Sequence, residues 1–170
     1  DVHTQRAVNG SLQKLLLFQT GLPHALATEE GLAMLAEQKR NVQTNNALLY
    51  QTHLLWAIDQ ARHLGFRPLF ERLKLRVGPQ LSWLICLRIK RGLAHPNAPG
   101  VYAKDSIYLV GWKLVRDWLN AGNNIRDLYV GCVGVHHPIK EWHAQGWVSY
   151  QETPTLWFAR DYASTGSTGS

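Results

Sequence analysis

Apolar residues recur at helical spacing along much of this chain, and this periodicity limits the possible fold more than any other feature. Between Ala47 and Leu64, apolar side chains return every three or four positions, and a glycine follows the run. A second apolar stripe, for which Asp105 or Ser106 supplies the N-cap, continues to about Asn120. Two long amphipathic helices are therefore expected, and with them a mainly α fold.

Turn signals divide the rest of the sequence into further helices. Helices are predicted at residues 28–40, 47–64, 68–77, 79–91, 106–120, 125–130 and 138–145. Thr28 is the expected N-cap of the first of these, whereas Asn9-Gly10 should interrupt an earlier helical pattern. Val148 and Tyr150 suggest a single strand, so the fold class has at most a short strand near the C-terminus.

Length and composition favour one folded core. A chain of 170 residues with 45% hydrophobic content can form one domain or a large part of one. No apolar run reaches the roughly 18 residues that a membrane-spanning helix needs, and the first residues lack a signal-peptide pattern. The two cysteines, Cys86 and Cys132, are too few for a disulfide framework and lack CxxC spacing, which favours a reducing, cytoplasmic setting. Because no spanning run is found, no membrane partner is expected. Residues 161–170 have low complexity and are interpreted as a tail or linker outside the fold.

The formal charge of +6 is compatible with nucleic acid, acidic protein tails or carboxylate substrates. Most basic residues are scattered along the chain, and they gather only at Arg88, Lys90 and Arg91. Aromatic residues do not alternate with this group, as they do in proteins that stack nucleic-acid bases. A helical nucleic-acid binder is therefore the least favoured class.

Three separated motifs resemble one known family. They are Thr-Glu-Glu-Gly-Leu-Ala at 28–33, Arg-Ile-Lys-Arg-Gly at 88–92, and Pro99-Gly100 leading into Lys-Asp-Ser-Ile-Tyr-Leu at 104–109. In this order they resemble the flavohemoglobin expression-modulating QEGLA motif proteins, a family that includes microtubule-associated tyrosine carboxypeptidases. The resemblance covers about residues 1–150. It implies a gluzincin-like helical metallopeptidase domain, of which residues 1–160 would be the C-terminal part.

The resemblance also implies a zinc site. Family members carry an HExxxH motif and then a glutamate on the next helix, and Asp1-Val2-His3 matches only the last half of that motif. By this resemblance His3 and Glu30 are zinc ligands, and Glu30 is preferred to Glu29 because the family motif has glutamine at the position of Glu29. A further histidine ligand and the glutamate base are expected immediately upstream of Asp1. The chain alone is therefore expected to be inactive, with the upstream remainder of the catalytic domain as its partner.

Each candidate in the first part of the chain also has a structural explanation. A carboxylate pair at a helix start, such as Glu29 and Glu30, complements the positive end of the helix dipole. A lone histidine such as His3 is more often a surface residue than a ligand. Asn9 either caps the interrupted helix or orients a substrate backbone. The motif context, and no single residue, carries the metal-site prediction.

The remaining candidates would serve the substrate. Arg88 and Arg91 lie three positions apart, and their planar guanidinium groups suit a terminal carboxylate, although a solvated basic face would have the same spacing. Lys104 either binds that carboxylate or pairs with Asp105. Tyr108 either donates a hydrogen bond to the oxyanion of a tetrahedral intermediate or is a core tyrosine.

The predicted function of the intact protein is zinc-dependent peptide hydrolysis of the carboxypeptidase type. Water activated by zinc would attack a peptide bond near the C-terminus of a peptide or protein, and the basic residues would hold the free carboxylate. The alternative is a noncatalytic regulatory or scaffold domain that modulates gene expression or protein assembly, as the family's expression-modulating label suggests. Zinc content and peptide hydrolysis distinguish these two functions.

Overall fold

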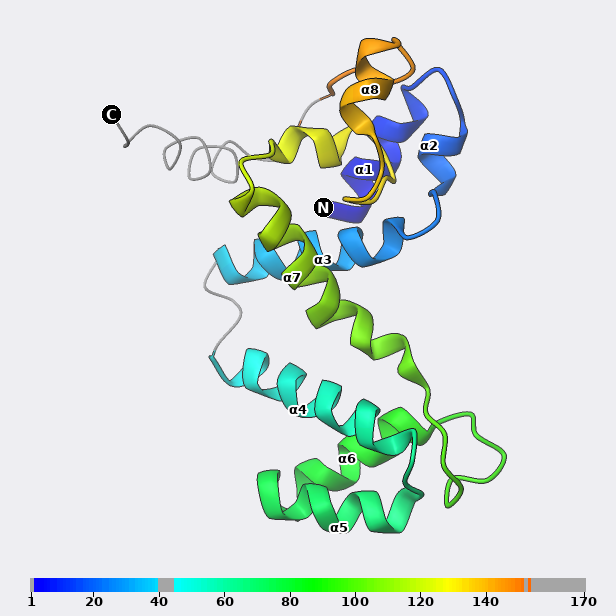
Figure 1. The fold of residues 1–170 in the computed structure, drawn as a ribbon, viewed down its shortest axis with the longest axis vertical. Coiled ribbons are helices and arrows are strands. Elements are labelled where there is room, and N and C mark those ends of the chain that lie inside the picture. The colour runs from blue at the N-terminus through cyan, green and yellow to red at the C-terminus, as the bar shows by residue number, and fades with distance from the viewer. Residues whose placement is uncertain (1, 40–44, 152, 154–170) are drawn as a thin grey trace. The chain divides into compact units, whose positions relative to one another are not determined.

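Helices make up the regular structure of the described residues, and the chain divides into two units (Figure 1). The computed structural model describes residues 2–39, 45–151 and 153. One unit takes Asp1–Val42 together with Val110–Ser170, and the other consists of Gln43–Leu109. The predicted tail at 161–170 lies outside the described residues. In the part that is described, every helix is too short or too polar to span a bilayer.

The first unit encloses one apolar core. Its elements are α1 (Val2–Ser11), α2 (Leu17–Thr20), α3 (Ala25–Lys39), the larger part of α7 (Ser106–Asn120), the 3₁₀ helix η2 (Ile125–Tyr129) and α8 (Ile139–Ala144). Their inward faces bury a set of apolar side chains that includes Phe18, Leu32, Leu35, Val115 and Leu128. The predicted mainly α fold is therefore confirmed for this unit.

The second unit has a core of its own. Its elements are α4 (Asn45–Ala61), α5 (Phe66–Val77), α6 (Pro79–Lys90) and the 3₁₀ helix η1 (Ala103–Asp105). Gly78 joins α5 to α6 with a φ of 78°, and Pro79 then begins α6 where its missing N–H costs no helical hydrogen bond. The core is formed by buried side chains from all three α-helices, among them Leu54, Leu69, Ile85 and Ile89.

A buried lysine connects the loop after α6 to the end of α4. Lys90 is 3% exposed, and its ammonium group donates to the carbonyl oxygens of Leu64 (2.6 Å), Gly100 (2.7 Å) and Ala98 (3.0 Å). Burial lowers the pKa of Lys90, and the carbonyl oxygens replace the water that the charge loses. Lys90 therefore stabilises the loop, although its position in the sequence suggests a basic surface group.

The predicted helices are present, but the start of α3 differs from the prediction. This helix begins at Ala25, so Thr28 lies inside it and is not its N-cap. The Thr28 side chain is buried, and its hydroxyl oxygen accepts a hydrogen bond from the Val135 N–H at 3.0 Å. A threonine that resembles a cap in the sequence thus connects α3 to the segment after η2.

The interruption predicted at Asn9-Gly10 is also wrong. Helix α1 continues through both residues and ends at Ser11. A Cβ added to Gly10 would lie 2.2 Å from the Phe18 carbonyl oxygen. Gly10 therefore permits a close approach of α1 to α2, which accounts for a glycine inside the helix.

The strand predicted around Val148 and Tyr150 is wrong, and the described residues contain no strand. The backbone N–H of Ser149 donates to the Gln13 side chain at 2.7 Å, and that of Val148 donates to the Trp142 carbonyl oxygen at 3.5 Å. These backbone donors are thus satisfied without a partner strand. Val148 is apolar because it is buried in the core of the first unit.

Two glycines allow α3 and α7 to cross in close contact. A Cβ added to Gly31 would lie 2.2 Å from the Gly111 carbonyl oxygen, and one added to Gly111 would lie 2.0 Å from the Ala27 carbonyl oxygen. A side chain at either position would therefore push the two helices apart. Gly31 directly follows Glu30, so the crossing also determines where the carboxylates of α3 lie.

We expect Gly31→Ala to destabilise the protein, although alanine is the better helix former. Helix propensity alone would favour the substitution by about 1 kcal/mol. The clash with the Gly111 backbone costs more, because two packed helices must separate, and the free energy of unfolding from urea titrations should fall by about 2 kcal/mol. Glu37→Ala, on the exposed side of α3, is the control and should change it by less than about 0.5 kcal/mol. A Gly31→Ala protein as stable as the parent would contradict the close crossing.

Candidate functional site

His3 on α1 lies against two carboxylates of α3. Its Nδ1 is 2.8 Å from Oε1 of Glu29, and its Nε2 is 3.9 Å from Oε2 of Glu30. The His3 side chain is 51% exposed, whereas each glutamate side chain is 17% exposed. Because α3 begins at Ala25, both glutamates lie beyond its first turn, and the helix dipole does not explain the pair. One imidazole thus meets two adjacent acids, with each ring nitrogen facing a different carboxylate.

A buried arginine lies behind Glu29. Arg6, one turn after His3 on α1, is 0% exposed, and its guanidinium group donates to the carbonyl oxygens of Leu128 (3.0 Å) and Val133. Its Nη1 has no hydrogen-bond partner in the described residues and is 3.9 Å from Oε2 of Glu29. Burial lowers the pKa of Arg6, and the Glu29 charge opposes that shift. Glu29 is therefore the counter-ion of a buried charge as well as a neighbour of His3.

His3 and Glu30 offer donor atoms of the kinds that zinc takes in proteins. Zinc binds imidazole nitrogen and carboxylate oxygen at about 2.0–2.2 Å, so two ligands of a tetrahedral ion lie roughly 3.4 Å apart. The observed separation of 3.9 Å between Nε2 and Oε2 is close to that span. Among the described residues, no three histidine, cysteine, aspartate or glutamate side chains are grouped to hold a metal ion. The two residues therefore fit part of a zinc site, which would need a further ligand.

Asn9 lies on α1 but is buried, with 1% of its surface exposed. Its Nδ2 donates to the Tyr129 carbonyl oxygen at 2.6 Å, and its Oδ1 accepts from Nε2 of Gln5 at 2.8 Å. Asn9 thus connects α1 to η2 in this structure. The predicted contact with a substrate backbone would require the amide to leave these partners.

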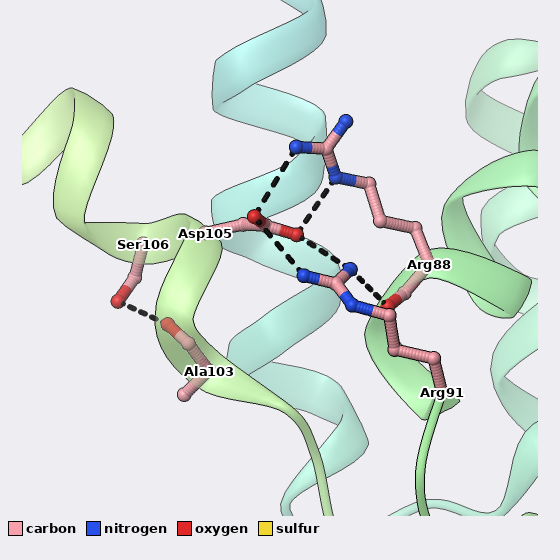
Figure 2. A network of polar contacts seen from close by, with 5 residues as sticks. All are labelled: Arg88, Arg91, Ala103, Asp105 and Ser106. Carbon is pink, nitrogen blue, oxygen red and sulfur yellow. Dashed lines mark hydrogen bonds and ion pairs between the residues drawn. The ribbon is translucent and has the colours of Figure 1, made fainter.

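In the second unit, Arg88 and Arg91 both bind the carboxylate of Asp105 (Figure 2). Arg88 contacts the two oxygens through Nε (2.7 Å) and Nη2 (3.2 Å), and Arg91 through Nη1 (3.0 Å) and Nη2 (3.4 Å). Asp105 is 4% exposed, whereas the arginine side chains are 41% and 42% exposed. Two guanidinium groups share one carboxylate, so one positive charge remains unbalanced where the cluster meets solvent.

The ion pairs determine how the groups of this cluster ionise. Burial by itself raises the pKa of Asp105, but hydrogen bonds from Arg88 and Arg91 outweigh it and lower that pKa to about 2. The carboxylate in turn raises the pKa of both arginines. Arg91 also stacks on Tyr102, with its guanidinium carbon 4.1 Å from the ring centre. The arginines are therefore charged and held in place without any ligand.

Lys104 and Tyr108 come from the same unit as this cluster. Lys104 lies in η1 and is exposed, and Asp105 binds the two arginines in place of the predicted pairing with Lys104. Tyr108 lies near the start of α7 and is half-buried. The predicted site residues are thus divided between the units. The metal candidates and Asn9 belong to the first unit, and the substrate candidates and Tyr108 belong to the second.

Sequence reasoning does not predict the contacts of three residues of these clusters: Arg6, Glu29 and Asp105. It prefers Glu30 to Glu29, and it considers Asp105 only as a helix cap or as a partner of Lys104. Helical spacing does place Arg6 on the same face as His3. The carbonyl oxygens that permit its burial belong to residues 128 and 133, however, and no local pattern near Arg6 indicates them.

Comparison with known proteins gives a family match. A family model described as microtubule-associated tyrosine carboxypeptidase matches residues 1–165. The chain is 39% identical over 117 residues to microtubule-associated tyrosine carboxypeptidase 1 of Mus musculus and to that of Rattus norvegicus. Each alignment covers 64% of this chain and 24% of the relative. The Homo sapiens protein of that name is 39% identical over 95 residues, which are 54% of this chain and 19% of the relative. The chain thus spans about a quarter of the length of the curated relatives it matches.

Asp105 should make the stability of the protein depend on pH in the acid range. A carboxylate whose pKa is lowered on folding stabilises the folded state above its unfolded pKa, here 3.8, and this contribution is lost as the pH falls through about 2. Asp105→Asn should therefore lower the free energy of unfolding at neutral pH by about 1–2 kcal/mol. This value is smaller than the full pKa shift would give, because solvent screens the partly exposed arginines. Denaturant titrations should show the variant and the parent converging between about pH 4 and about pH 2.

The control for this measurement is Asp117→Asn. Asp117 pairs with Lys113 on the exposed side of α7, where an ion pair contributes little. The free energy of unfolding of Asp117→Asn, plotted against pH, should run parallel to that of the parent protein. A difference between Asp105→Asn and the parent that stays constant down to about pH 2 would contradict the pairing of Asp105 with the arginines.

Proposed function

The chain belongs to the family of microtubule-associated tyrosine carboxypeptidases, and from this premise we propose that the intact protein is a zinc-dependent carboxypeptidase. The observation that carries the proposal is the approach of His3 to Glu30, which come from different helices and lie 3.9 Å apart at Nε2 and Oε2. Imidazole and carboxylate are both ligands of hydrolytic zinc sites. Family membership supports the reaction class, and the geometry supports the choice of ligands.

In this proposal, His3 binds the ion through Nε2 and Glu30 binds it through its carboxylate. Zinc, when bound, would polarise water and the substrate carbonyl group. Glu30 is mostly buried, so solvent screens its charge only in part, and it remains a strong partner for a cation. Half of the His3 side chain is exposed, so a substrate can approach this part of the first unit.

The Arg88–Arg91 cluster would bind the free carboxylate of the substrate. Asp105 balances only one of the two guanidinium charges, and it holds both side chains in place. A pre-ordered arginine pair loses little conformational freedom when a carboxylate binds. Lys104 would add a second point of attraction for the carboxylate, and Tyr108 would donate a hydrogen bond to the oxyanion of the tetrahedral intermediate.

The names of the relatives refer to tyrosine and to microtubules. We extend this to the present chain and propose that its intact form removes a C-terminal tyrosine from a protein. The net charge of +6 favours an acidic protein tail as the substrate, because opposite charge speeds association. A microtubule substrate would place the activity in the cytoplasm, as the cysteine content also suggests.

Loss of either proposed ligand should remove zinc and activity together. In the intact protein, His3→Ala and Glu30→Gln should each reduce bound zinc, measured by elemental analysis after dialysis. Each should also lower kcat/KM for a peptide with a C-terminal tyrosine by more than about 100-fold, the upper end of the effect of outer-shell partners. Glu37→Gln removes an exposed carboxylate from the same helix, and as the matched control it should retain both properties.

Two results would contradict this proposal. Zinc retained at full stoichiometry by both ligand variants would place the ion at other residues. An intact parent protein that folds but neither binds zinc nor hydrolyses the peptide would favour the noncatalytic regulatory or scaffold function.

The basic cluster predicts a preference for substrates with a free carboxylate. Arg91→Ala should lower kcat/KM for a peptide with a free C-terminus by about 10- to 100-fold, the loss expected for a hydrogen bond to a charged group. It should change the weak hydrolysis of the amidated peptide little, because that peptide lacks the charge. Arg67→Ala removes an exposed arginine of the same unit and serves as the control. Equal hydrolysis of free and amidated peptides by the parent protein would exclude a carboxylate-binding role for the Arg88–Arg91 cluster.

A further inference from the structure

Glu29 stands between a half-exposed histidine and a buried arginine, and the proposed zinc site does not use it. Its Oε1 is 2.8 Å from Nδ1 of His3, and its Oε2 is 3.9 Å from Nη1 of Arg6. The two oxygens of one carboxylate thus face two different groups of α1. His3 and Arg6 are three positions apart on that helix, so a single side chain of α3 can contact both.

Arg6 leaves Glu29 little freedom to move. The guanidinium group has no exposed surface, and the carbonyl oxygens of Leu128 and Val133 hold it. Removing the counter-ion of a buried charge is strongly destabilising, because the remaining charge is left without compensation. Among the described residues, Glu29 is the acid that pairs with this guanidinium group. Its carboxylate is therefore held close to α1.

The other contact of Glu29 determines which nitrogen of His3 is available. A neutral imidazole carries its proton on one ring nitrogen and offers a lone pair on the other. An acceptor beside Nδ1 stabilises the tautomer with the proton on that atom. Nε2, which faces Glu30, is then the unprotonated nitrogen.

We propose that Glu29 is a positioning residue that accepts a hydrogen bond from the Nδ1–H of His3 and thereby presents an unprotonated Nε2 toward Glu30. Arg6 holds Glu29 in place from its buried side. The ligand role of Nε2 rests on the proposed function, whereas the tautomer and its dependence on Glu29 do not.

Glutamine at position 29 separates the two contacts of Glu29. Its side-chain carbonyl oxygen can still accept a hydrogen bond from Nδ1–H of His3, but it brings no negative charge to Arg6. Alanine removes the acceptor and the charge together. Glu29→Gln should thus lose stability and keep the tautomer, whereas Glu29→Ala should lose both.

The direct test is the ring ¹⁵N spectrum of His3 in the intact, metal-free protein labelled with ¹⁵N-histidine. At about pH 8 an ordinary imidazole is neutral, and the signal missing from His3→Gln identifies His3. In the parent and in Glu29→Gln, Nδ1 should have the shift of a protonated nitrogen and Nε2 that of an unprotonated one. In Glu29→Ala the two tautomers should exchange, and the two shifts should average.

Zinc affinity gives a second measurement, by competition with a chromophoric chelator. Glu29→Ala should bind zinc about 10- to 100-fold more weakly than the parent, as expected when the outer partner of a histidine ligand is removed. Glu29→Gln should bind zinc with nearly the parental affinity. Glu37→Ala, on the exposed side of the same helix, should alter neither the affinity nor the tautomer.

If His3 in the parent protein carries its proton on Nε2, the proposal is overturned. This measurement uses the parent protein alone, so it does not depend on whether any variant folds. A tautomer that survives in Glu29→Ala, or one that is lost in Glu29→Gln, would also overturn it. The expected tautomers without any zinc binding would refute the proposed peptidase function while supporting the role of Glu29.

Discussion

The burial of one positive charge constrains the first unit more than any other interaction. The Arg6 guanidinium group is removed from water, so protein groups must supply its hydrogen-bond acceptors and its counter-ion. Carbonyl oxygens in η2 and in the segment after it supply the acceptors, and Glu29 of α3 supplies the negative charge. These contacts hold α1 against two segments that are distant in sequence. Because His3 lies one turn before Arg6, the same contacts bring its imidazole to the carboxylates of α3.

Three consecutive residues of α3 have three different physical tasks. Glu29 faces the buried charge and one nitrogen of His3, Glu30 faces the other nitrogen, and Gly31 permits the close crossing of α3 and α7. A side chain at position 31 would displace the helix that carries both acids. Packing therefore explains the glycine of this motif, and charge pairing explains its first acid. The ligand role proposed for Glu30 depends on both.

The helices could be predicted from the sequence because apolar spacing and turn residues are local signals. Buried charges could not be predicted, because their partners come from elsewhere in the chain. Lys90 looks like a surface residue until the carbonyl oxygens of Leu64, Ala98 and Gly100 are seen around it. Thr28 looks like a helix cap for a similar reason. The approach of His3 to Glu30 was predictable only through the family motif, since neither residue alone indicates a metal.

The proposed zinc site requires that His3 and Glu30 bind the same cation. This can be examined in a crystal structure of the intact protein with zinc, with anomalous maps recorded on both sides of the zinc absorption edge. We expect one zinc ion about 2.0–2.2 Å from Nε2 of His3 and from a carboxylate oxygen of Glu30, with Glu29 at Nδ1. A zinc ion bound to other residues, or bound to Nδ1 of His3 with Glu29 as its ligand, would rule out this site.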